Sequence, residues 1–162
     1  MSASSKSFSI DLRAFVAKTK ENMDEVTRAA INDIGNRLIK ASPVGDRELW
    51  SENIVRAQHG LPLTPPGYVG GKFKNSWDCS VDGPPTALYR TPDATGAEST
   101  ARIAAGIPTE AGGHVYFIAN NQPYAVPLED GHSTQAPLGI VGLTVFDWQQ
   151  IVDAAVTTVR GS

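Results

Sequence analysis

The sequence predicts an α+β domain in which a long N-terminal helix and a C-terminal helix pack on one face of a small, mainly antiparallel sheet. Helical periodicity runs through residues 11–41 and returns after residue 144. Between these two segments lie short runs whose apolar residues either alternate with polar ones or follow one another. Consecutive short strands favour an antiparallel meander, and two helices can cover one of its faces.

The first predicted element is one amphipathic helix over residues 11–41. Ser9 or Asp11 can cap its start, and Pro43 stops it because proline cannot continue a helix. Its apolar residues recur at spacings of three and four, as on one helical face: Leu12, Phe15, Val16, Met23, Val26, Ala30, Ile34 and Leu38.

Residues 45–71 are rich in aspartate, proline and glycine and predict an irregular insertion, with a short helix allowed only around residues 48–58. A compact domain rarely contains a loop of this length unless the loop has a function or is disordered. We therefore expect a partner contact. Trp50 is a candidate aromatic anchor, and packing within the loop is the alternative for it. The length of the chain matches one hydrophobic core, so residues 1–162 are expected to form a single domain.

Four short segments predict strands. Residues 72–81 alternate polar and apolar side chains, which indicates a half-buried strand with one polar face. Residues 103–107 alternate in the same way, and residues 86–90 allow a further short strand. Residues 115–119 are a continuous apolar and aromatic run with β-branched members, which is typical of a buried strand.

The last predicted element is a C-terminal helix that begins at a capping box, with Thr144 as the cap and Asp147 as the acid. Its apolar stripe consists of Trp148, Ile151, Val152, Ala155, Val156 and Val159. Helices and sheet would share one core. We expect this core to include Phe15, Ile34, Trp77, Phe117, Trp148 and Ile151.

Composition narrows the class of protein. With 41% hydrophobic and 19% charged residues the chain is globular, and its single cysteine, Cys79, excludes an internal disulfide framework and fits a reducing cytoplasm. After residue 43 seven Lys and Arg face twelve Asp and Glu, so no basic footprint for specific nucleic-acid binding is expected. We expect no secretion signal and no membrane span, because no apolar leader or sufficiently long apolar run occurs.

The most informative segment is residues 115–145, in which a polar, proline-rich loop follows an apolar strand. Pro123, Pro127 and Pro137 remove three backbone donors, so we expect an ordered loop here rather than a regular helix or a central strand. Gly131 can supply a positive φ in the polar turn. The composition indicates a loop of fixed shape on the surface.

Particular residues of this loop carry a resemblance to a known family. They are Asn121-Gln122-Pro123-Tyr124-Ala125, Leu128-Glu129, Gly131-His132-Ser133, Gln135-Ala136-Pro137, Gly139 and Leu143-Thr144-Val145. This pattern resembles the signature of the tail-completion, or neck, proteins of long-tailed bacteriophages. Ser42-Pro43-Val44 and the segment that ends in Trp77 are also similar to the family, although residues 45–70 separate them here. Residues 140–142 depart from the family, which commonly has Met and Arg there.

The resemblance implies a structural virion protein that completes or caps the tail tube and joins it to the head connector as a homo-oligomeric ring. The six-fold symmetry of the tail implies that this ring is a hexamer. Its partners would be copies of itself, the tail tube protein and a head-tail connector or stopper protein. Viral DNA would pass through the ring without sequence-specific binding. The protein would act in the host cytoplasm during assembly and then in the neck of the virion. A tail terminator or head-proximal stopper of the same junction is the alternative.

No enzyme, metal or cofactor is implied, and the interaction surface is expected at Tyr124, Glu129, His132, Ser133 and Gln135. A small cytoplasmic hydrolase that uses His132 and Glu129 is the rival from another class. Adjacent loop residues do not point at one another as a catalytic triad requires, and no metal-ligand spacing occurs around them. We expect Glu129 to accept hydrogen bonds from loop amides or from a neighbouring subunit.

Overall fold

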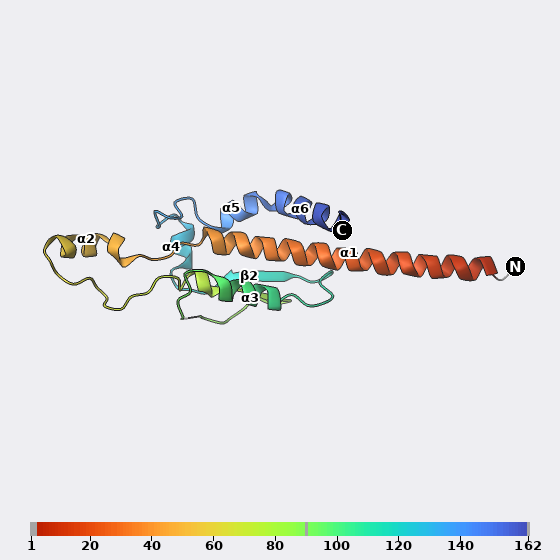
Figure 1. Cartoon of the computed structure of the whole chain (residues 1–162), viewed down its shortest axis with the longest axis horizontal. Coiled ribbons are helices and arrows are strands. Elements are labelled where there is room, and N and C mark those ends of the chain that lie inside the picture. Colours follow the sequence, from red (N-terminus) through yellow and green to blue (C-terminus); the bar gives the residue numbers. More distant parts are fainter. Residues whose placement is uncertain (1–2, 90, 162) are drawn as a thin grey trace.

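The computed structural model describes residues 3–89 and 91–161, with side chains from residue 11 onward. The molecule is elongated, and helix α1 (Ala3–Ala41) forms its axis (Figure 1). The C-terminal helix α6 (Trp148–Arg160) packs against α1, and a two-stranded antiparallel sheet lies along the same half of α1. The predicted α+β class, with a long first helix, a last helix and a small sheet, is confirmed.

Among the side chains of α1 that the structure describes, the buried ones lie in the C-terminal half of the helix. The helix begins at Ala3, so neither Ser9 nor Asp11 caps it, and it ends at Ala41 before Pro43 as predicted. Its core residues are Ala30, Ile31, Ile34, Leu38 and Ile39. The prediction that Phe15 is buried is wrong: its side chain is 69% exposed, because the N-terminal half of α1 extends beyond the body of the molecule (Figure 1).

The sheet consists of β1 (Trp77–Val81) and β2 (Tyr116–Asn120), paired so that Trp77 faces Asn120 and Val81 faces Tyr116. The strand predicted over residues 72–81 is therefore correct only in its second half, because a 3-10 turn (Lys74–Ser76) precedes β1. Residues 86–89 form no strand, and residue 90 lies outside the described residues. In the described part of the chain the predicted meander is reduced to one pair of strands.

The strand predicted at residues 103–107 is wrong, because most of this segment belongs to helix α3 (Ala97–Ala105). The Asp93 carboxylate prepares the start of α3 by accepting hydrogen bonds from the hydroxyl of Thr95 and from the backbone N–H groups of Thr95 and Glu98. These bonds lower the pKa of Asp93 to about 2, and the bond from the Thr95 hydroxyl contributes most. Helix α3 packs on both β1 and α1 through Ile103, which is 1% exposed.

The insertion at residues 45–71 contains a 3-10 turn (Arg47–Leu49) and helix α2 (Ser51–Gln58), which confirms the short helix. Its centre is Asn53, 1% exposed, whose amide donates to the carbonyls of Arg47 and Thr64 and accepts from the Thr64 N–H. These bonds close the insertion on itself. It projects from the end of the molecule opposite the N-terminus (Figure 1).

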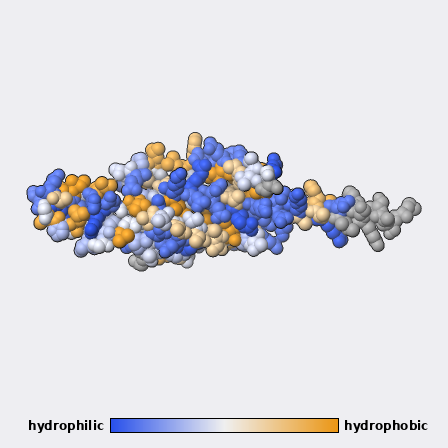
Figure 2. Space-filling model, in the orientation of Figure 1, coloured by the Kyte–Doolittle hydropathy of each residue, from blue (hydrophilic) through white to orange (hydrophobic). Residues whose placement is uncertain are grey.

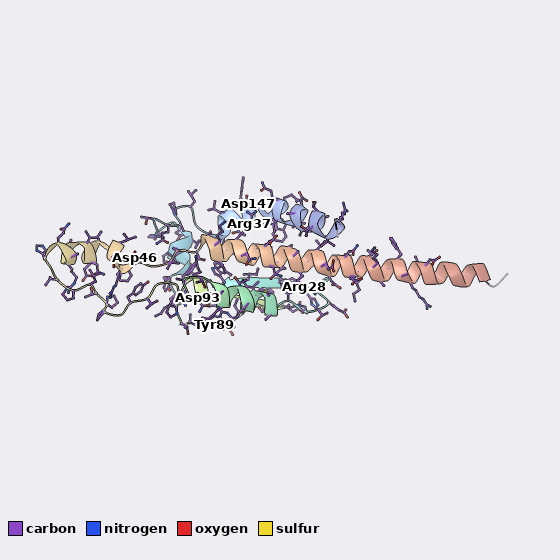
Figure 3. The ribbon with its side chains drawn as sticks, in the orientation of Figure 1. Arg28, Arg37, Asp46, Tyr89, Asp93 and Asp147 are labelled. Carbon is purple, nitrogen blue, oxygen red and sulfur yellow. The ribbon has the colours of Figure 1, made fainter. Side chains whose placement is uncertain are left out.

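Two short helices occupy the segment before α6. Helix α4 (Ala125–Glu129) corrects the prediction of a helix-free loop, since Pro127 lies in its first turn, where a backbone donor has no partner within the helix. The predicted capping box is wrong, because Thr144 lies inside helix α5 (Val141–Phe146) and does not cap a helix. The Thr144 hydroxyl donates to the carbonyl of Ile140 inside α5, and Asp147 forms an ion pair with Arg37 of α1 (Figure 3).

The core lies where α1, α3, α6 and the sheet meet. Ile34, Trp77 and Ile151 are buried as predicted, and Phe117 is half-buried. The prediction for Trp148 is wrong: its side chain is 50% exposed, because it borders a groove beside α1 rather than filling the centre. Among the residues described, no helix combines the length and the apolar character needed to cross a membrane.

Candidate interaction surface

The segments that carry the family resemblance meet in the fold although they are far apart in the chain. The indole Nε1 of Trp77 donates to the hydroxyl of Ser42 at 2.7 Å, and that hydroxyl donates to the Leu38 carbonyl in the last turn of α1. All three residues are buried. Ser42 therefore both ends α1 and satisfies the buried indole of the strand, which explains why these residue types suit these positions.

Side-chain amides attach the first part of the 121–137 loop to the same region. The side chain of Gln122 donates to the Ser76 hydroxyl at 2.7 Å and to the Tyr89 carbonyl. The neighbouring amide of Asn120 donates to the carbonyl of Phe73 at 2.8 Å. These bonds fix the point at which the chain leaves β2 and enters α4.

Glu129 fixes the second part of the loop. Its Oε2 accepts the N–H groups of Ile140 and Val141, and its Oε1 accepts the N–H of Gly142, each at 2.8 Å. Partial burial alone would raise the pKa of this carboxyl, but the three backbone donors outweigh it and hold the pKa below the ordinary 4.5. The expectation that Glu129 binds loop amides is confirmed, and the carboxylate caps the start of α5.

Two glycines shape the same turn. Gly131 has φ +81°, which confirms the positive φ predicted for it, and Gly139 has φ +78°. A Cβ atom on Gly139 would lie 2.5 Å from the carbonyl oxygen of Glu129. Both the backbone conformation and the close approach therefore require glycine at this position.

The fixed loop forms one wall of a hollow of about 490 Å³, and the insertion forms the facing wall. We call this surface the aromatic hollow and define it by Trp50, Tyr68, Lys72, Tyr124, His132 and Gln135. Ser133 also lines it, whereas Glu129 does not. The structure thus brings together four of the five predicted interaction residues and gives Glu129 a supporting role.

Aromatic rings make up much of the surface of the hollow. The rings of Trp50 and Tyr68 meet edge to face with centroids 4.8 Å apart, and the Tyr124 ring lies 6.1 Å from that of the buried Phe73. Burial and the neighbouring Tyr68 hydroxyl raise the pKa of Tyr124. Trp50 and Tyr124 still expose 39% and 41% of their surface, so both can bury further area against a partner.

His132, Glu129 and His114 each have separate partners in the structure. The Nδ1 atom of His132 is 2.9 Å from the Pro127 carbonyl, and both oxygens of Glu129 are occupied by backbone amides. His114 lies elsewhere, with its Nδ1 3.5 Å from a carboxylate oxygen of Asp82. The part of the chain that the structure describes contains no group of three or more His, Cys, Asp or Glu that could hold a metal ion.

Sequence reasoning missed Tyr68 and Lys72 as members of this surface. Tyr68 lies near the end of the insertion, for which the pattern assigned no partner within the chain, and Lys72 follows the insertion directly. The sequence did contain a signal for Tyr68, because it is an aromatic residue in a glycine-rich segment. Glycine has no side chain, so another part of the chain can approach it closely. The structure places the Tyr68 hydroxyl against Gly45, where a side chain would collide with it.

No family model, curated protein or solved structure matches the chain.

Proposed function

We propose that the protein is a structural component of a bacteriophage neck, which completes or caps the tail tube and joins it to the head connector as a homo-oligomeric ring. One observation carries the proposal. The loop side chains best suited to chemistry, above all Glu129, hold the shape of the loop, while aromatic and polar side chains beside them stay exposed in a hollow. This arrangement suits recognition of a protein surface better than turnover of a substrate.

The pattern that resembles tail-completion proteins supports this role because its members act together. Ser42 and Trp77 bind each other, Gln122 binds the turn before β1, and Gln135 binds the segment after α1. These contacts hold together the segments that carry the resemblance, and Gln135 among them also lines the aromatic hollow.

The proposed mechanism is docking by a preformed surface. The aromatic hollow and the insertion lie at one end of the elongated molecule, and further apolar side chains are exposed there (Figures 1 and 2). These are Leu49, Ile54, Val55, Leu61 and Val69. In a ring, this end of every copy would face the same partner, either the last ring of the tail tube or the connector. Burial of the aromatic anchors would supply most of the affinity.

The test is binding of the purified protein to tail tubes and, separately, to connectors of the phage that encodes it. Cosedimentation should retain the wild type on one of the two partners. The double variant Trp50→Ala/Tyr124→Ala should lose most of this binding, and the control Leu88→Ala, an exposed apolar residue outside the hollow, should keep it.

The outcomes separate the proposal from its rivals. Capping of tubes without connector binding would indicate a tail terminator. Wild-type protein that binds neither tubes nor connectors would contradict a neck role altogether.

A further inference from the structure

An apolar groove of about 510 Å³ runs along the buried half of α1. We call it the α1 groove. Its walls come from α1, from β2 and from the α5–α6 segment, and it is bordered by Val26, Ile34, Ile118, Val145, Trp148 and Val152. Val145 and Trp148 are 65% and 50% exposed although both are large and apolar. The groove is therefore an unfilled apolar surface beside the buried half of α1.

The N-terminal half of α1 carries apolar side chains that nothing in the described part of the same copy covers. We call residues 11–23 the arm, which is part of the helix that extends beyond the body (Figure 1). Four apolar side chains on the arm are 50–69% exposed, and apolar colour is visible there beside the undescribed end (Figure 2). These side chains are Leu12, Phe15, Val16 and Met23.

The four arm residues form one stripe. At about 100° of rotation per residue, they fall within one third of the helix circumference. The same face carries Val26 and Ile34, which border the groove. The stripe is thus the apolar face of α1 continued past the point where the body stops covering it.

Arm and groove match in length. The thirteen residues of the arm extend about 20 Å at 1.5 Å per residue. The part of α1 that borders the groove, residues 26–38, is also thirteen residues long and extends about the same distance. A single helical segment of the arm's length could therefore lie along the whole groove.

Charge indicates which helix would lie there. The arm contains three Lys or Arg and two Asp or Glu, whereas residues 24–162 contain ten Lys or Arg and fifteen Asp or Glu. The arm, with its small positive charge, is attracted to the acidic body of another copy and repelled by another arm. Lys20 already shows this preference within one chain, where it pairs with Glu110 of the body at 2.6 Å.

We propose that the arm of one copy binds in the α1 groove of a second copy. The inference rests on the proposed ring, because it names the two surfaces by which the copies would join. Arm and groove are different surfaces of the same chain, so the contact can be repeated head to tail until a ring closes, or exchanged between two copies. It covers the exposed stripe and fills the groove in one step.

The test is the mass of the full chain in solution, measured by native mass spectrometry and light scattering. Wild type should form oligomers. Phe15→Lys on the arm and Val145→Arg in the groove should each reduce it to monomers, because each places a charge in the apolar contact. Both positions are exposed within one copy, so both variants should fold. The controls Ala14→Lys and Gln150→Arg add the same charge beside these sites, at exposed positions outside the stripe and the groove, and should assemble like wild type.

A mixing experiment tests the pairing itself. Phe15→Lys has an intact groove and Val145→Arg has an intact arm, so an equimolar mixture contains one sound arm–groove pair. The mixture should form one-to-one heterodimers and nothing larger, whereas each variant by itself stays monomeric. Wild type that is monomeric at every concentration, or Phe15→Lys that assembles as wild type does, would overturn the inference.

Failure here is distinguishable from failure of the neck role. Rings that bind tail tubes and are unaffected by Phe15→Lys would refute the arm contact and keep the neck role. Oligomers that depend on the arm and the groove but do not bind tubes or connectors would support the arm contact and refute the neck role.

Discussion

Gln135 binds both backbone polar groups of Val44, although the two residues lie 91 positions apart. The Gln135 side-chain oxygen accepts the Val44 N–H at 3.1 Å, and its amide nitrogen donates to the Val44 carbonyl at 2.9 Å. The side chain thus makes the same pair of hydrogen bonds with Val44 that the backbone of a neighbouring β-strand would make. It joins the loop that follows α4 to the segment that follows α1, and so holds two walls of the aromatic hollow together.

Gln135→Glu should loosen this junction. A carboxylate can still accept from the Val44 N–H but cannot donate to the carbonyl, and it places a negative charge beside a carbonyl oxygen. Because the site is exposed, we expect a loss of only about 1 kcal/mol in the free energy of unfolding, measured in urea. Limited proteolysis should cut the 130–138 segment faster than in wild type. Gln150→Glu, on the exposed side of α6, should change neither measurement.

Glu129→Gln should cost more stability. The amide that replaces the carboxylate keeps one acceptor oxygen but turns an NH₂ group toward backbone N–H donors, so at least one of the three bonds is lost and the charge is removed. Hydrogen bonds to charged groups contribute about 1.5–3 kcal/mol, and we expect a loss of about 2 kcal/mol in urea unfolding. Asp130→Asn is the matched control, because Asp130 is exposed and adjacent. Equal stability of the two variants would contradict the capping role.

The same carboxylate should make stability depend on pH. The pKa of Glu129 in the folded protein lies below its ordinary value of 4.5, so the folded state binds the proton less tightly than the unfolded state. The stabilisation is complete above the ordinary pKa and is lost as pH falls through the folded pKa. The stability difference between wild type and Glu129→Gln should therefore stay constant near neutral pH and shrink in acid below 4.5. A difference that grew in acid would contradict the direction of the shift.

Long-range periodicity was the most reliable guide to the fold. The α1 stripe and the α6 stripe each extend over several turns, so local exceptions do not obscure them. The error at residues 103–107 has a physical cause, because Ile103 belongs to a helical face with Ser99, four residues before it, and both are buried. Capping by Asp93, which lies before the alternation begins, decides in favour of the helix.

Burial was harder to predict than helix position. Phe15 and Trp148 belong to correct apolar stripes, yet both are exposed, because a stripe shows which face is apolar and does not show where the covering element stops. The aromatic hollow was likewise predictable only in part. Tyr124 and His132 were expected in it from the loop, but Tyr68 enters through a contact between distant segments, which no local pattern encodes.

Cys79 should be unreactive in the folded protein. The thiol is 5% exposed in β1, and burial, followed by the charge of Asp78, raises its pKa to about 11. Reaction requires the thiolate, which is scarce far below the pKa. A thiol reagent such as iodoacetamide at pH 8 should therefore label the protein only as fast as it opens. Labelling should become rapid at urea concentrations that unfold the chain. Rapid labelling without urea would show that β1 opens locally.

Gly35→Ala should destabilise the protein, which is the opposite of the usual effect in a helix. Alanine in mid-helix ordinarily stabilises by about 0.5–1 kcal/mol relative to glycine. Here a Cβ atom would lie 2.7 Å from Cδ1 of Ile103, at the buried contact between α1 and α3. Overpacking of this kind costs about 1–3 kcal/mol, so the urea midpoint should fall. Gly142→Ala in α5 is the control, because its Cβ would meet Glu129 at an ordinary contact distance of 3.4 Å, and its midpoint should not fall below that of wild type. A Gly35→Ala protein as stable as wild type would show that α3 does not pack this closely on α1.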